Sequence, residues 1–269
     1  MLDEIGKAMK AVKNVLLTLM LEHRIGDLTL PKGSIVFGTT NLASDGVGDS
    51  LEAHARNRVC FTTVRKPHAG FNADGSIDED SWGLWAINND IDPVILAWVR
   101  ATPHCLESYT DPSQRENGLI FQPTKPEQLA CVTPRSLHKA SNIVKMRHIL
   151  GADVTQALLA GTIGPQAAAE MQAFITVVDK LPTWEAIVQD PKNAKVPGAM
   201  DVIAKCLIVL SALSRVDEKS IDSWIDYAER LDLEWQAMFA KSSMKSQKQS
   251  VLVRNAKFKT WAIKNQWAF

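Results

Sequence analysis

The first residues of the chain that could do chemistry are an acidic pair. Asp3 and Glu4 directly follow Met1 and Leu2. An aspartate followed by a glutamate at the end of a strand can hold Mg²⁺ and orient an attacking water, as nucleotide hydrolases require. The same pair also suits the start of a helix, where Asp3 would cap the helix and Glu4 would face the positive end of its dipole. The pair alone leaves both interpretations open.

Three further positions could serve phosphoryl transfer, which is catalysed mainly by positioning and by placed positive charge. Asn41 follows a predicted strand, Arg58 precedes another, and Arg135 follows a proline at the start of a predicted helix. Asn41 could instead be a turn residue, and Arg58 could solvate a helix end. Arg135 could be an ordinary first-turn residue, but the helix dipole disfavours a cation there, which favours a special role.

The order of these motifs along the chain resembles that of AAA+ ATPases of the MoxR-like group, beginning inside the Walker B motif. The resemblance has motif support over residues 1–150 and is looser up to residue 235. The motifs that carry it are, in chain order, Asp3-Glu4, Leu30-Pro31-x-Gly33, the strand end Thr39-Thr40-Asn41, Arg56-Asn57-Arg58 and Thr133-Pro134-Arg135.

The resemblance implies a role for each candidate. Asp3 would help to hold Mg²⁺ through its water shell, and Glu4 would orient the attacking water. Asn41 would be the first sensor, a polar side chain near the γ-phosphate. Arg58 resembles the arginine finger that reaches into the nucleotide site of a neighbouring subunit, and Arg135 resembles the second sensor on the helical lid.

The same resemblance implies cofactors and partners. The cofactors would be ATP and Mg²⁺. The partners would be further copies of the chain, in a ring that is expected to be a hexamer, and a client protein that the ring remodels or activates.

The chain departs from the family at the phosphate-binding loop. No GxxxxGK[ST] occurs among the 269 residues. The turn Thr162-Ile163-Gly164-Pro165 has neither the lysine nor the preceding strand of such a loop. We therefore expect the sequence to be truncated on its N-terminal side, within the Walker B motif, and the chain alone to be inactive as an ATPase.

The pattern of elements predicts an α/β region followed by an all-α region. Residues 1–66 are expected to form a partial AAA+ core with a parallel sheet, because a helix over 50–56 separates two apolar, β-branched segments at 34–40 and 59–64. An apolar stripe predicts another helix over 4–24.

The remaining residues are predicted to be helical. Residues 67–150 are expected to form the helical lid, and residues 151–269 a helical C-terminal extension with a basic tail. Helices are predicted over 81–88, 93–102, 134–149, 152–160, 165–180, 183–189, 198–216, 218–240 and 255–266.

Composition excludes several classes of protein. Hydrophobic residues make up 46% of the chain and charged residues 22%, with a formal net charge of zero, as in folded globular proteins rather than disordered ones. The four cysteines form no CxxC pair and the six histidines no ligand spacing, so no site of zinc type is predicted. No apolar run approaches the roughly 20 residues of a membrane span, and no secretory signal is visible, so a cytoplasmic protein without membrane partners is expected.

The C-terminal stretch carries a competing signal. Beyond Glu234 the chain has basic residues and no acidic ones, interleaved with aromatic side chains. Such a stretch could contact nucleic acid by phosphate neutralisation and base stacking, bind a partner protein, or form a helix with solvated lysines. The alternative to an ATPase is therefore a non-enzymatic helical interaction module. The aromatic residues are Phe258, Trp261, Trp267 and Phe269.

Two smaller expectations concern the helical region. Residues 241–250 are rich in lysine, serine and glutamine and are predicted to be a flexible linker. Trp82, Trp85 and Trp98 recur at roughly helical spacing and are predicted to anchor the core.

Overall fold

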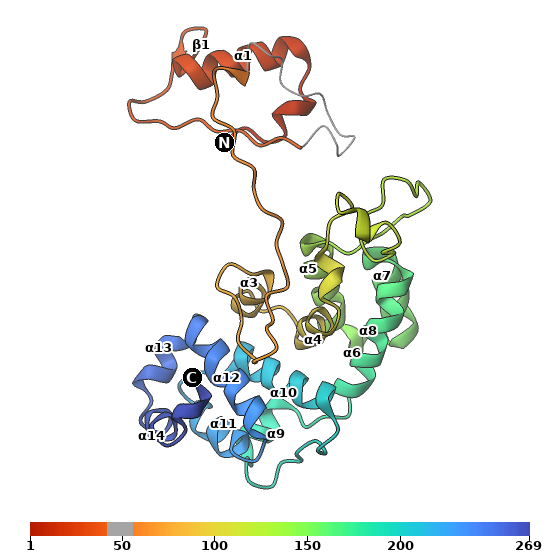
Figure 1. The fold of residues 1–269 in the computed structure, drawn as a ribbon, viewed down its shortest axis with the longest axis vertical. Helices are drawn as coiled ribbons and strands as arrows, with labels where there is room; N and C mark the ends of the chain where they lie inside the picture. Colours follow the sequence, from red (N-terminus) through yellow and green to blue (C-terminus); the bar gives the residue numbers. More distant parts are fainter. Residues whose placement is uncertain (42–55) are drawn as a thin grey trace. The chain divides into compact units, whose positions relative to one another are not determined.

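The chain consists of two compact units, which we describe separately (Figure 1). The computed structural model describes residues 1–41 and 56–269. Unit 1 is Met1–Arg65 and unit 2 is Lys66–Phe269. The described residues are mostly helical, and the one sheet among them is a small antiparallel pair of strands. The expected helical region is therefore present, whereas the parallel sheet expected within residues 1–66 is not formed by the described residues.

Unit 1 begins with a 3-10 turn, Ile5–Lys7, and continues into helix α1, Lys10–Glu22. The prediction that Asp3 caps this helix is wrong, because the N-cap is Met9 and no side chain caps the helix. The segment between the turn and the helix is extended, so the predicted helix over 4–24 starts six residues later. Leu17 packs against Ile5, and these two are the buried hydrophobic side chains among the described residues of unit 1.

The sheet of unit 1 is a short hairpin after α1. His23 ends the helix in the left-handed conformation, and β1, Arg24–Ile25, then pairs with β2, Leu28–Thr29. The segments 34–40 and 59–64 were predicted as buried parallel strands, and this is wrong for the described residues. A fully buried strand needs neighbours on both sides and covered faces. Ile35, by contrast, is 85% exposed. The helix predicted over 50–56 lies outside the described residues except at Arg56.

Unit 2 is a helical assembly (Figure 1). Short 3-10 turns at Pro103–Leu106, Pro112–Gln114 and Gln266–Ala268 accompany its helices. The helices are α3 Trp82–Asn88, α4 Pro93–Ala101, α5 Pro134–Lys145, α6 Arg147–Leu150, α7 Ala152–Ile163, α8 Pro165–Val178, α9 Trp184–Gln189, α10 Val202–Arg215, α11 Ile221–Ala228, α12 Leu233–Lys245, α13 Gln249–Arg254 and α14 Ala256–Lys264.

Local signals start many of these helices. The side chains of Ser81, Asp92, Thr133 and Thr183 each accept a hydrogen bond from a backbone N–H in the first turn of the following helix. Proline occupies an early position in α4, α5 and α8, where its missing N–H costs nothing. These caps explain why the helix starts could be predicted closely.

The core of unit 2 forms around α4 and α10. Helix α4 packs against α5, α8 and α10, and α10 in turn packs against α12. Trp98 of α4 is fully buried, and its indole N–H donates a hydrogen bond to Glu170 of α8. An aromatic cluster of Trp184, Trp224, Tyr227 and Phe239 joins α9, α11 and α12.

Three predicted features of unit 2 need correction. The helix predicted over 218–240 is two helices, α11 and α12, and the helix predicted over 134–149 is α5 followed by α6. The predicted linker 241–250 is the end of α12 and the start of α13. Three of its four serines are buried, and their hydroxyls donate to backbone carbonyls: Ser242 to Gly75, Ser243 to Ala240 and Ser246 to Ser243.

The tryptophan prediction holds for two of three residues. Trp82 and Trp98 are buried in the core. Trp85 is 43% exposed, and its ring meets that of His138 edge-on. Trp82 and Trp85 are three residues apart in α3, so helical periodicity places them on the same side and could not predict that their burial differs.

A loop at the start of unit 2 is tied to α12. Residues 72–78, which we call the 72–78 loop, are closed by bonds among Asn72, Ser76 and Asp78. Lys241 binds Asp74, Ser242 donates to the Gly75 carbonyl, and Lys245 donates to the Ile77 carbonyl. The loop therefore depends on residues from the other end of the unit.

Across residues 1–41 and 56–269, no helix is both long enough and apolar enough to span a bilayer.

Candidate functional site

The acidic pair of unit 1 lies beside the end of the segment 34–40. The Leu2 N–H donates to the Phe37 carbonyl and the Thr39 N–H donates to the Leu2 carbonyl, both at 2.9 Å. These bonds form an isolated parallel bridge between Leu2 and Gly38. The chain directions are those expected for neighbouring strands of a parallel sheet, although the pairing is only one bridge long.

Thr39 connects the two acidic residues. Its hydroxyl donates to the Asp3 carboxylate, and the same oxygen accepts the Glu4 backbone N–H at 3.1 Å. The Ile5 N–H donates to the Thr39 carbonyl at 2.9 Å. Glu4 adopts a left-handed backbone with φ of 52°, which is uncommon for a residue other than glycine. Four consecutive residues are therefore held against one strand end.

Both carboxylates face solvent. Asp3 and Glu4 are exposed. Thr39 engages Oδ1 of Asp3 and leaves Oδ2 without a hydrogen-bond donor among the described residues. Glu4 Oε1 forms an ion pair with Lys7 Nζ at 2.7 Å. Asp3 can thus accept a further ligand as it stands, whereas Glu4 must release Lys7 before it can orient a water.

The other predicted site residues of unit 1 are near in sequence but are not bonded to this pair. Asn41 comes two residues after Thr39 and is exposed. Arg58 is exposed in a turn and has no hydrogen bond or ion pair to the described residues. The structure therefore brings Asp3 and Glu4 together with Thr39, and neither Asn41 nor Arg58 is bonded to them among the described residues.

Arg135 belongs to unit 2, where it is the second residue of α5. Thr133 and Ser136 form a reciprocal capping box at the start of this helix, and Arg135 is exposed between them. The local structure is that of an ordinary, well-capped helix start with a cation pointing to solvent.

The fit of Mg²⁺ to this site can be judged from its donors. In residues 1–41 and 56–269 no three His, Cys, Asp or Glu side chains gather as a metal cage. Mg²⁺ in nucleotide enzymes is commonly held by one or two carboxylates, waters and phosphate oxygens rather than by a full protein cage. The open oxygen of Asp3 fits that arrangement only when phosphate oxygens complete it.

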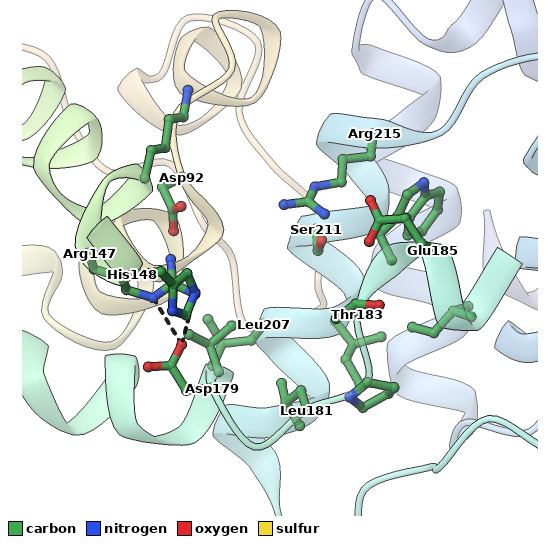
Figure 2. A pocket seen from close by; sticks show the side chains of 16 residues that line it. Asp92, Arg147, His148, Asp179, Leu181, Thr183, Glu185, Leu207, Ser211 and Arg215 are labelled. Carbon is green, nitrogen blue, oxygen red and sulfur yellow. Dashed lines mark hydrogen bonds and ion pairs between the residues drawn. The ribbon is translucent and has the colours of Figure 1, made fainter. Parts of the chain in front are cut away.

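A second candidate site, which the sequence did not predict, is a cavity of about 360 Å³ in unit 2 (Figure 2). One side is formed by Asp92 at the start of α4 and by Lys145, Arg147 and His148. The other side is formed by α9 and α10, including Arg215 at the end of α10. The walls come from four separate stretches of sequence, so no local motif could have signalled the cavity.

Some charged groups that line this cavity are paired within the protein, and others are not. Arg147 binds Asp179 Oδ1 through Nε at 2.9 Å and through Nη2 at 2.8 Å. Asp92 is 8% exposed, and its Oδ1 caps α4 by accepting the Val94 N–H at 2.9 Å. Burial raises the pKa of the Asp92 carboxyl, and the positive charges of Arg147 and Arg215 oppose that rise.

Two lysines of the basic C-terminal stretch form ion pairs within the molecule. Lys241 pairs with Asp74, and Lys257 pairs with Asp226. Phe258 and Trp261 are buried. The exposed large apolar side chains of this stretch are Val253, Ile263, Trp267 and Phe269.

Comparison with known proteins gives no relative for the chain. No protein-family model matches it, and neither a curated protein nor a solved structure is similar to it.

Proposed function

We propose that unit 1 supplies the Mg²⁺-holding and water-orienting carboxylates of an ATP-hydrolysing site, in a MoxR-like AAA+ protein that remodels or activates a client protein. The observation that carries the proposal is the junction between Asp3-Glu4 and Thr39. Two motifs that are 36 residues apart in sequence meet through a parallel bridge and a shared hydroxyl. A capped helix start, the competing interpretation of Asp3-Glu4, would not bring them together, and Asp3 caps no helix.

The geometry supports a different role for each residue of this site. Thr39 fixes one oxygen of Asp3, which leaves the other to hold a water of the Mg²⁺ shell. Glu4 would leave Lys7 and accept a hydrogen bond from the attacking water. The metal supplies charge neutralisation at the phosphates. Asn41, two residues after Thr39, would be the first sensor, a polar side chain near the γ-phosphate.

The remaining groups come from elsewhere in the assembly. Arg58 is exposed and unpaired among the described residues, as an arginine acting on the site of a neighbouring copy would be. Arg135 of unit 2 keeps the role of second sensor that the family resemblance implies. The phosphate-binding loop does not occur in residues 1–269 and must be supplied by residues outside them.

The reading frame upstream of Met1 gives the first test. We expect an in-frame extension that encodes a strand, GxxxxGK[ST] and a helix. An in-frame stop codon immediately before Met1 would contradict the proposal.

Kinetics on the protein expressed from the whole frame gives the second test. Glu4→Gln should lower kcat by at least about 100-fold while ATP binding changes little, because the lost interaction acts in the hydrolysis step. Glu22→Gln removes an exposed carboxylate from the same unit and should leave kcat unchanged. Equal losses in the two variants would refute the assignment of Glu4.

Mixed assemblies test the role of Arg58. Arg58→Ala subunits and Glu4→Gln subunits are each expected to be inactive alone. Some interfaces in a mixture contain both native residues, so part of the activity should return. No recovery at any mixing ratio would argue against a site shared between copies.

The alternative function is a non-enzymatic interaction module, and one observation favours it. Ile263 is 72% exposed, and Trp267 and Phe269 are about half exposed at the end of unit 2. Exposed apolar groups of this size are typical of protein-binding surfaces. Binding of a labelled single-stranded oligonucleotide that weakens steeply with salt would assign the surface to nucleic acid instead.

A further inference from the structure

The cavity of unit 2 contains two polar groups of opposite charge that the protein leaves unsatisfied. Arg215 makes no hydrogen bond or ion pair with the described residues, although its guanidinium carries five donors. Oδ2 of Asp92 accepts no hydrogen bond from them, although this carboxylate is more than nine-tenths buried. Figure 2 shows both side chains pointing into the space between the two walls.

The charge of the cavity is balanced rather than one-sided. The lining includes three permanent cations and three carboxylates. A phosphate or another polyanion would meet the carboxylates as well as the cations, and so would gain little. A ligand that carries one charge of each sign matches both unsatisfied groups. The lining groups are Lys145, Arg147, Arg215, Asp92, Asp179 and Glu185.

The rest of the lining is apolar. Leu181, Leu207 and Ile208 form part of the surface between the charged groups. A cavity of about 360 Å³ has the size of small-molecule sites in proteins. A ligand that fits this lining carries an aliphatic group in addition to its two charged groups.

We propose that this cavity binds a small zwitterion with an aliphatic side chain, an amino acid or a short peptide, with its ammonium at Asp92 and its carboxylate at Arg215. The guanidinium presents parallel donors that suit a carboxylate in bidentate fashion. Oδ2 of Asp92, which accepts no hydrogen bond from the described residues, gains a charged partner. The site lies within unit 2 and does not depend on ATP hydrolysis.

The test uses the 269-residue chain with leucine and leucyl-leucine as probes, in calorimetry and thermal-shift measurements. Binding of either probe is expected, and the tighter of the two distinguishes a free amino acid from a peptide. Leucinamide lacks the carboxylate and N-acetyl-leucine lacks the ammonium. Each should bind at least about tenfold more weakly than leucine, because one charge-assisted contact is lost.

Substitutions test which charged group of the ligand each residue binds. Arg215→Gln should weaken binding at least about tenfold and remove the preference for leucine over leucinamide. Arg254→Gln, which changes an exposed arginine of α13, should bind as the native chain does. Asp92→Asn keeps an oxygen to cap α4 and should remove the preference for leucine over N-acetyl-leucine.

Four results would overturn the proposal. They are the absence of binding by both probes at about 10 mM, equal binding of leucine and N-acetyl-leucine, unchanged binding in Arg215→Gln, and binding of inorganic phosphate at the same site with higher affinity than either probe. Because Arg215 is exposed, its variant is expected to fold even if Asp92→Asn does not.

Discussion

Two isoleucines show how differently the two units are built. Ile35 of unit 1 is 85% exposed, on a segment whose composition predicted a buried strand, whereas Ile95 of unit 2 is fully buried in α4. Unit 1 buries the pair Ile5 and Leu17, and unit 2 buries one continuous core. An apolar β-branched segment becomes a buried strand only when other elements cover it. Unit 2 provides this cover from its own helices.

The largest expected effect comes from substituting each of these isoleucines by alanine. Ile95→Ala should lower the free energy of unfolding of unit 2 by about 2–5 kcal/mol, because it leaves a cavity in a packed core. Ile35→Ala should change the stability of the chain by less than about 0.5 kcal/mol. Urea unfolding followed by far-UV circular dichroism measures both, because unit 1 contains no tryptophan whose fluorescence could report its unfolding. A comparable loss in Ile35→Ala would mean that the segment 34–40 is covered in solution.

A pair of glycines gives the next largest effect. Gly70 has φ of 77°, and a Cβ added there would lie 2.0 Å from Cβ of Ser81, the residue that caps α3. Gly70→Ala should therefore cost about 2–4 kcal/mol, from backbone strain plus the clash.

Gly33 of unit 1 is the control for that clash. Its φ is 89°, but nothing lies within 4 Å of the added Cβ. Gly33→Ala should cost only the backbone strain, about 1–2 kcal/mol. Thermal unfolding of the two variants compares them. Equal losses would show that Ser81 moves aside without cost.

The smallest expected effect is a loss of stability of unit 2 at low pH. Hydrogen bonds from the Ser220 hydroxyl, and from the Ser220 and Lys219 backbone N–H groups, hold the pKa of Asp217 below its usual value. The unfolded chain therefore takes up this proton at higher pH than the folded chain. The stabilisation is present above the usual aspartate pKa of 3.8 and is lost as pH falls through the lower, folded value.

Asp217→Asn should make unit 2 less sensitive to acid than the native chain, as should Ser220→Ala, which removes the main donor. Melting temperatures measured from about pH 5 down to pH 2 provide the comparison. A native slope that persists in both variants would assign the acid sensitivity to other carboxylates.

The helices of unit 2 were predictable because their signals are local. Asp92-Pro93 and Thr133-Pro134 each combine a capping side chain with a proline that tolerates the first turn, and the helices begin there. The burial of serines in the predicted linker could not be predicted, because it involves a distant partner. Ser242 is buried because the Gly75 carbonyl accepts its hydroxyl, and nothing within residues 241–250 indicates that partner.

The candidate sites also depend on contacts between residues that are far apart in sequence. The contact between Asp3 and Thr39 was not predicted, because a bridge between positions so far apart leaves no local pattern, and only the family resemblance assigned both motifs to one site. The cavity of unit 2 was missed altogether. Asp92 and Arg215 belong to different helices, and each alone was an unremarkable end of a helix.

The attachment of the 72–78 loop to α12 has a consequence for the order of folding. The bond from Ser242 to Gly75 spans 167 residues, so the loop cannot reach its final form on the ribosome until α12 has emerged. Closing so long a segment costs entropy before any contact repays it, which slows the last step of folding. Until then, the 72–78 loop lacks its contacts with Lys241, Ser242 and Lys245.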